Sequence, residues 1–184
     1  MQSSTPSAAG RPRSDLHATA FAATLRSVSE LGYAGATMDR IAVAAGVAKT
    51  TLYRRWPSKG ALIVDCLLDA FGPVRLQGTD RGEIMASAIH WVAAKIGEPG
   101  VGAAFAGVFS DAINDPALRT ILSERLQEPY RLTLQEALGE PDDRILLLID
   151  IVTGTLLHRM GMTGEPMVDA DVAVLVEMVL RTFG

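Results

Sequence analysis

Residues 37–59, TMDRIAVAAGVAKTTLYRRWPSK, decide the fold of the N-terminal region. Their apolar positions recur at intervals of three and four, as in an amphipathic helix. Thr37 can cap a first short helix, and Gly46 ends it because glycine takes the left-handed turn conformation without steric cost. A second short helix is predicted over about residues 48–56, before Pro57 breaks it. Two short helices joined by a tight turn are typical of the unit that reads the DNA major groove.

The residues around Gly46 have the spacing that a helix-turn-helix requires. The small Ala42 lies four residues before it, where the two helices cross, and Leu52 lies six residues after it as an apolar plug. Ile41, Ala45 and Val47 complete the expected miniature core. Trp56 is expected to anchor that core, with stacking on a base as the alternative.

The second helix is expected to enter the groove with its N-terminus first, so that Lys49, Thr50 and Tyr53 face bases or phosphates. A lysine can donate to guanine O6 and N7, and a threonine methyl can pack on a thymine methyl. Thr37 can donate to a phosphate at a helix N-terminus. The candidate DNA contacts are Thr37, Lys49, Thr50, Thr51, Tyr53, Arg54, Arg55, Lys59, Arg11 and Arg13. For Arg54, Arg11 and Arg13, an ordinary solvent-exposed role explains the sequence equally well.

The charge is divided unevenly along the chain. Residues 1–60 hold eight Lys and Arg against three Asp and Glu, a net charge of +5. Residues 61–184 hold nine against eighteen, a net charge of −9. This division indicates that only the N-terminal region meets DNA phosphates, although clustering on solvated faces is the alternative.

No stretch shows the two-residue alternation of a strand, so the predicted fold class is all-α. Residues 1–13, rich in Ser, Pro, Ala and Arg, are expected to form a flexible basic arm. Residues 14–60 are predicted to be a three-helix helix-turn-helix DNA-binding domain. Residues 61–184 are predicted to be a helical domain for effector binding and dimerisation. Within it, Asp115 and Pro116 should start a helix that Pro129 kinks or divides.

Residues 16 to about 68 resemble the N-terminal domain of TetR-family transcriptional regulators. The resemblance is carried by residues 31–62, LGYAGATMDRIAVAAGVAKTTLYRRWPSKGAL. The shared features are Gly-Tyr before the second helix, Ala-Gly-Val at the turn, Leu-Tyr in the third helix and Ser-Lys after it. Residues 154–180, GTLLHRMGMTGEPMVDADVAVLVEMVL, are similar to the C-terminal part of some members, with less specificity.

The resemblance implies an all-helical homodimer whose DNA-binding head represses transcription until a small molecule loosens its contact with DNA. It also implies phosphate or base contacts at Thr37, Lys49, Thr50, Tyr53, Arg55 and Lys59. Two residues depart from the family pattern. Thr50 stands where many members have glycine, and Gly60 replaces a frequent acid, which should weaken the first turn of the fourth helix by up to ~1 kcal/mol.

Two predicted helices of the C-terminal region, about residues 141–161 and 169–183, are apolar around more than half their circumference. On the first helix, Leu147, Ile151, Gly154 and His158 form a second apolar face beside Ile145, Leu148, Ile149, Val152 and Leu156. On the last helix, Val174 and Met178 do the same beside Val172, Leu175, Val176 and Val179. A surface helix needs one apolar stripe, so the second faces predict a homodimer through these helices. Core packing within one chain is the alternative.

A small-molecule site is expected in the body, where charges are few and a mostly apolar effector fits. Its candidate residues are Met85, Ile89, Trp91, Val92, Phe105, Phe109 and His158. Gly100, Gly102 and Gly107 are expected to leave room around the two phenylalanines. Plain core packing explains the same residues.

An enzyme is not expected, because the three histidines lie on separate predicted helices and no nucleophile motif or phosphate-binding glycine loop occurs. No metal or cofactor is expected either. A small-molecule carrier without DNA function is a second rival, against which the Lys49, Tyr53 and Lys59 set argues. With no signal sequence, no uncharged apolar run of membrane-spanning length and a lone Cys66, the expected location is the cytoplasm, away from membranes.

Overall fold

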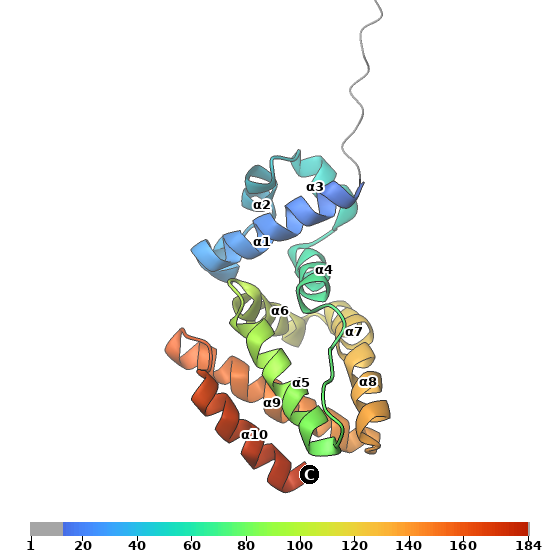
Figure 1. The fold of residues 1–184 in the computed structure, drawn as a ribbon. Coiled ribbons are helices and arrows are strands. Elements are labelled where there is room, and N and C mark those ends of the chain that lie inside the picture. The colour runs from blue at the N-terminus through green and yellow to red at the C-terminus, as the bar shows by residue number, and fades with distance from the viewer. Residues whose placement is uncertain (1–12, 184) are drawn as a thin grey trace, which may run out of the picture.

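The computed structural model describes residues 13–183, and every regular element in that range is helical, as predicted. The order is α1 (Arg13–Gly35), α2 (Met38–Ala45), α3 (Lys49–Arg55), α4 (Lys59–Phe71), α5 (Arg81–Gly97), α6 (Val101–Asn114), α7 (Pro116–Leu122), a π-helical turn (Ser123–Gln127), α8 (Glu128–Leu138), α9 (Asp142–Thr163) and α10 (Asp169–Phe183). Helices α1–α3 form a head, α5–α10 form a body, and α4 runs between them (Figure 1).

The head has the predicted helix-turn-helix. The Thr37 hydroxyl caps α2 by accepting from the Arg40 amide at 3.3 Å, and Gly46 ends that helix in the left-handed conformation, with φ 65°. Ile41, Ala42, Ala45 and Leu52 are buried between α2 and α3, with Val47 packed against them. The sequence therefore predicted the Thr37 cap, the turn at Gly46 and the miniature core of the helix-turn-helix.

The helices of the body begin and change direction at points that the sequence also indicated. Asp115 caps α7 by accepting from the amides of Ala117 and Leu118, and Pro116 occupies its first position. Before Pro129 the helix widens into the π-turn, in which the Glu128 amide bonds to the Ser123 carbonyl five residues earlier. Because proline has no amide hydrogen, a rearranged turn at this point is the expected response.

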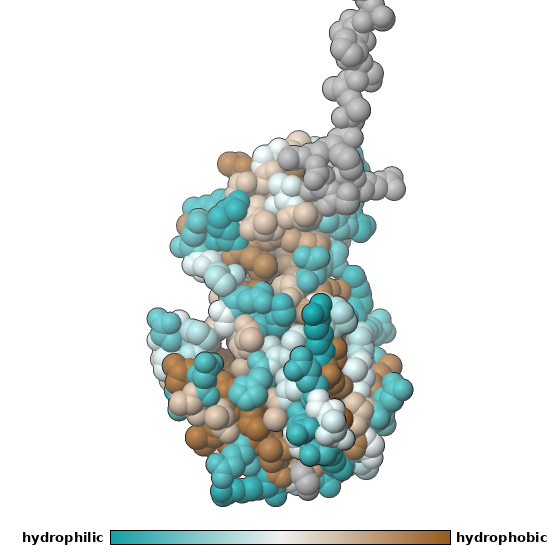
Figure 2. Space-filling view, viewed as in Figure 1, coloured by the Kyte–Doolittle hydropathy of each residue, from teal (hydrophilic) through white to brown (hydrophobic). Residues whose placement is uncertain are grey.

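Helices α9 and α10 have the two predicted apolar faces. Their inner residues Ile145, Leu148, Val152, Leu156, Val172, Leu175, Val176 and Val179 are buried, and Ile149 is half-buried. Their second faces remain exposed: Leu147 by 52%, Ile151 by 37%, Val174 by 54% and Met178 by 63%. In Figure 2, hydrophobic side chains are visible on the surface over α10, at the lower left.

By length and composition alone, helix α9 is also long and apolar enough to cross a membrane. It packs on α5, α6 and α8 as an element of the body, and it carries the charged Asp150 near its middle. Arg159 pairs with Asp171 at 2.8 Å, and the Arg144 guanidinium donates to the Thr182 carbonyl at 3.1 Å. These bonds join both ends of α9 to α10.

Candidate DNA interface and ligand cavity

Helix α3 presents one polar surface to solvent, because its apolar side is buried inside the head. Leu52 is completely buried, whereas Lys49, Thr50 and Tyr53 are exposed and Thr51 is half-buried. Residues 49, 50 and 53 lie on one face, since positions three and four apart are neighbours on a helix. The structure therefore brings together the three side chains that the sequence placed first at the groove.

Lys49 is linked to α2 by an ion pair that the sequence alone did not indicate. Its ammonium lies 2.8 Å from the Asp39 carboxylate and 5.6 Å from the centre of the Tyr53 ring. The hydrogen bond to Asp39 raises the pKa of Lys49 above its ordinary value, so the side chain stays a cation. Both partners are well exposed, and this pair is weak and easily exchanged for a phosphate or a base.

The C-terminal end of α3 faces α1 as well as solvent. The Arg55 guanidinium donates through Nε to His17 Nε2 at 3.0 Å, although the side chain as a whole is exposed. Trp56 is buried, packs against Phe21 and donates its indole N–H to Asp65 at 2.8 Å. Trp56 is thus the predicted core anchor. Arg54 is exposed, and the predicted contacts of Arg11 and the Arg13 side chain lie outside the described residues.

Lys59 and Tyr33 form the joint between head and body. The Lys59 ammonium lies 3.7 Å from the centre of the Tyr33 ring and donates to the Tyr33 carbonyl at 3.1 Å. The Tyr33 hydroxyl donates to Asp111 on α6 at 2.5 Å. Its ring fills the space beside Gly107, where an added Cβ would come within 2.1 Å of Tyr33 Cγ. The Tyr of the Gly-Tyr motif is therefore a docking residue, which its sequence pattern did not reveal.

The glycines of α6 serve close packing, and the expectation that they leave room around Phe105 and Phe109 is wrong. Gly100 faces the Leu25 carbonyl of α1, and Gly102 faces the Met160 side chain of α9, in both cases with no space for a Cβ. Gly60 in α4 has a similar use, because a Cβ there would lie 3.0 Å from Leu118 of α7. Its cost in helix propensity is thus offset by contact with the body.

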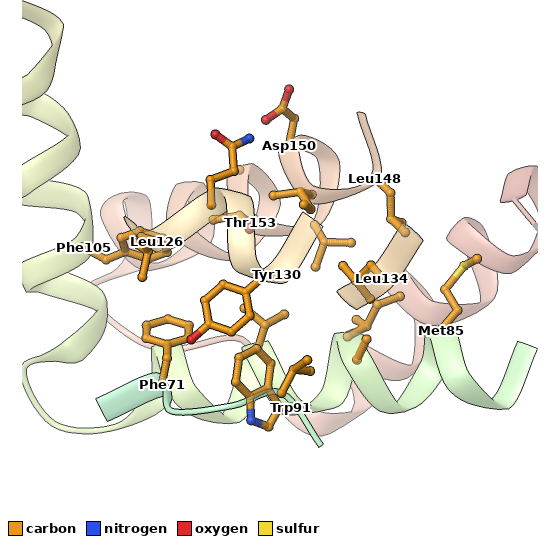
Figure 3. Close-up of a pocket in the computed structure, with 18 of the residues that line it drawn as sticks. Phe71, Met85, Trp91, Phe105, Leu126, Tyr130, Leu134, Leu148, Asp150 and Thr153 are labelled. Atoms are coloured by element: carbon orange, nitrogen blue, oxygen red, sulfur yellow. The ribbon is translucent and has the colours of Figure 1, made fainter. Parts of the chain in front are cut away.

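The body contains an apolar cavity of about 300 Å³ between α5, α6, α8 and α9. Its wall contains six of the predicted effector residues: Met85, Ile89, Trp91, Val92, Phe105 and Phe109. The side chains of Phe71 and Tyr130 complete an aromatic cluster with Trp91, with ring centres 5.4–6.3 Å apart (Figure 3). The Tyr130 hydroxyl donates to the Gly72 carbonyl at 2.7 Å.

His158 does not line this cavity, contrary to expectation. It is exposed on α9, four residues beyond the lining residue Gly154, or about 6 Å further along the helix axis. Sequence reasoning also missed Phe71, Tyr130 and Asp150, which line the cavity from segments far apart in the chain. Their aromatic or charged character in an apolar body was the only available signal.

Cys66 is buried, and that burial raises the pKa of its thiol, which keeps the thiol protonated and unreactive. Among residues 13–183, no group of three His, Cys, Asp or Glu side chains is arranged to hold a metal ion.

Two family models match most of the chain. The first, described as bacterial regulatory proteins of the tetR family, covers residues 20–66, and the second, described as a tetracyclin repressor-like C-terminal domain, covers residues 77–179. The chain belongs to the TetR family. It is a transcriptional regulator with a helix-turn-helix DNA-binding domain, and TetR-family regulators act without catalysis. Both parts of the sequence-based resemblance are confirmed.

Relatives named as HTH-type transcriptional regulators align with most of the chain. An uncharacterized HTH-type transcriptional regulator of Mycobacterium bovis is 26% identical over 171 residues, covering 87% of this chain and 83% of the relative. The uncharacterized HTH-type regulator YdeS of Bacillus subtilis is 28% identical over 183 residues, covering 91% and 89%.

Solved structures share the fold at lower identity. A putative TetR-family regulator from Mesorhizobium loti superposes with a TM-score of 0.66 at 16% identity, covering 94% of this chain and 97% of its own. The multidrug binding protein EbrR, complexed with imidazole, gives a TM-score of 0.66 at 19% identity, covering 98% and 97%.

Proposed function

We propose that this TetR-family protein is a cytoplasmic, ligand-responsive repressor that binds a palindromic operator as a homodimer. A small, mostly apolar molecule in the body cavity releases it from DNA. The observation that carries the proposal is the exposed Lys49, Thr50 and Tyr53 face of α3, fixed from behind by the buried Leu52. Thr37, the N-cap of α2, and Lys59, the first residue of α4, are assigned to backbone phosphates, and Lys59 would exchange its bond to the Tyr33 carbonyl for the phosphate.

The dimer is proposed to form through the exposed faces of α9 and α10. Leu147, Ile151, Val174 and Met178 present apolar surface that one chain leaves in contact with water. Gly154 is exposed, and a Cβ added there would have nothing within 4 Å, so a second helix can approach it closely. A two-fold dimer places two recognition helices against two half-sites of opposite orientation, which requires a palindrome.

Release by an effector is supported by the position of α6. Phe105 and Phe109 of this helix line the cavity, while Gly107 and Asp111 hold Tyr33 of the head. A ligand that displaces the two phenylalanines would therefore move the part of α6 on which Tyr33 of the head packs. The distance between the two recognition helices in the dimer would change with it.

The test combines DNA binding with the oligomeric state. Fluorescence anisotropy should show salt-sensitive binding to the intergenic DNA beside the protein's own gene, and weaker binding to unrelated DNA of equal length. Sedimentation should show a dimer at micromolar concentration. Ile151→Glu should give a monomer with lost operator affinity, whereas Ile113→Glu, at an isoleucine exposed on α6, should change neither property. Wild-type protein that sediments as a monomer would contradict the proposed assembly.

A further inference from the structure

The polarity of the cavity wall restricts the chemistry of the ligand. Of the lining residues within the described chain, Asp150 alone carries a formal charge, and no Lys, Arg or His reaches the wall. An anionic ligand would thus lose its hydration without meeting an opposite charge, which is strongly unfavourable in an apolar site. A neutral ligand would leave the one carboxylate unused.

Asp150 is available to a ligand. Within residues 13–183 no ion pair or hydrogen bond engages its carboxylate, in contrast to Glu140, Asp171 and Glu177, which pair with Arg144, Arg159 and Arg181. In the single chain Asp150 is exposed while lining the cavity, so its carboxylate lies where the cavity reaches the surface, at the edge of the α9 face assigned to the dimer. In Figure 3 it lies across the cavity from Phe71 and Trp91.

The cavity consequently has two chemically different ends. The inner end is aromatic and aliphatic, with Phe71, Trp91 and Tyr130 in mutual contact. Across the cavity from this aromatic cluster lies Asp150, and the wall also includes the polar side chains of Gln127 and Thr153. Aromatic rings attract cations through their negatively charged faces, and the acidic body adds a long-range field of the same sign.

We infer that the effector is a hydrophobic cation, with an apolar body in the aromatic end and an ammonium, amidinium or similar group beside Asp150. This inference rests on the effector-binding part of the proposed function and makes it specific. The carboxylate selects the sign of the charge, and the aromatic cluster supplies most of the affinity through apolar burial.

Three probes with one ring system and different head groups test the inference: (2-naphthylmethyl)trimethylammonium, 2-naphthalenemethanol and 2-naphthylacetate. Titration calorimetry measures their affinities, and quenching of Trp91 reports entry into the cavity, with Trp91→Phe as the control that separates it from Trp56. The ammonium probe should bind tightest and the carboxylate probe weakest. Added salt should reduce the difference in affinity between the ammonium and carboxylate probes, because the Asp150 carboxylate is partly exposed to solvent.

The variant Asp150→Asn keeps the shape of the side chain and removes its charge. It should weaken the binding of the ammonium probe roughly two- to fivefold and leave the binding of the alcohol unchanged. Glu136→Gln, on the exposed side of α8 and outside the cavity, removes the same charge from the body and should have no comparable effect. The pair separates local recognition from the general acidity of the body.

The outcomes distinguish the two levels of the proposal. Equal binding of the three probes, or an unchanged ammonium affinity in Asp150→Asn, would overturn the inference and leave a ligand cavity in place. If none of the three probes binds, the inference falls together with the effector-binding part of the proposed function. If Asp150→Asn loses the preference for the ammonium probe and Glu136→Gln keeps it, the result supports both the inference and the effector-binding part of the proposed function.

Discussion

The head and the body of this protein are built from contacts of different sequence range. In the head, Thr37, Gly46 and Leu52 lie within sixteen residues of one another, and local caps and one plug orient the DNA-facing side of α3. In the body, Phe71, Trp91, Tyr130 and Asp150 meet in one cavity although about eighty residues separate the first from the last. A local motif can be recognised from residue spacing, whereas a cavity assembled from distant helices cannot.

Substitution of Gly107 tests the joint between these two regions most severely. In Gly107→Ala the new Cβ would overlap the Tyr33 ring, so Tyr33 must leave its seat and lose its bond to Asp111. The expected destabilisation is about 3 kcal/mol, at the upper end of the range for overpacking. Urea denaturation followed by circular dichroism measures it as a lower midpoint.

The matched control is Gly161→Ala in α9, where an added Cβ has nothing within 4 Å. This variant should be neutral or more stable by up to ~1 kcal/mol, because alanine favours a helix interior over glycine. A Gly107→Ala protein as stable as wild type would show that Tyr33 does not hold the head on the body.

Removal of Lys49 tests the DNA-facing side of α3. Lys49→Ala should lower operator affinity at least about tenfold, since a good base contact contributes ~1–3 kcal/mol and each dimer loses two. Fluorescence anisotropy on operator DNA measures the change. Arg75→Ala removes an equal charge from an exposed position between α4 and α5 and should leave the affinity unchanged. Equal losses of operator affinity in both variants would show that Lys49 contributes only through the overall positive charge.

The response of stability to alkaline pH tests the contact between Tyr33 and Asp111 without a change in the shape of either side chain. Burial, the hydrogen bond to Asp111 and repulsion by that carboxylate raise the pKa of Tyr33 above its ordinary value. The unfolded chain therefore ionises this tyrosine first, near pH ~10, and the folded protein loses stability as the pH rises further.

Urea midpoints measured from pH 8 to pH 11 should fall less steeply in Tyr33→Phe than in wild type. Tyr130, whose pKa is also raised by burial, gives the comparison inside the body. An identical slope in Tyr33→Phe and wild type would argue against the contact with Asp111.

Removal of the ion pair between Asp39 and Lys49 should have the smallest effect of these changes, and the effect is on DNA binding. Asp39→Asn frees the Lys49 ammonium and removes a negative charge from the DNA-facing side, so binding to unrelated DNA should rise about two- to threefold. Anisotropy with operator and unrelated DNA at several salt concentrations measures the ratio. A reduced affinity for unrelated DNA would contradict this account of the pair.

Sequence reasoning succeeded where the relevant contacts were short in range. It placed the caps at Thr37 and Asp115, the turn at Gly46 and the interruption before Pro129, because each depends on the backbone chemistry of adjacent residues. It also divided α9 and α10 correctly into inner and outer apolar faces, since helical periodicity alone assigns sides. The domain boundary predicted at residue 60 and the contacts to DNA stay predictions.

The amino-acid order alone established an all-helical chain with a helix-turn-helix and a basic N-terminal region, because helix periodicity, capping and charge are properties of neighbouring residues. Three-dimensional packing assigned the glycines of α6 to close contacts, seated Tyr33 against Asp111, and placed Asp150 instead of His158 on the cavity wall. These outcomes depend on how far each helix slides and rotates against its neighbours. That geometry results from the fit of many side chains at once, which no single stretch of sequence encodes.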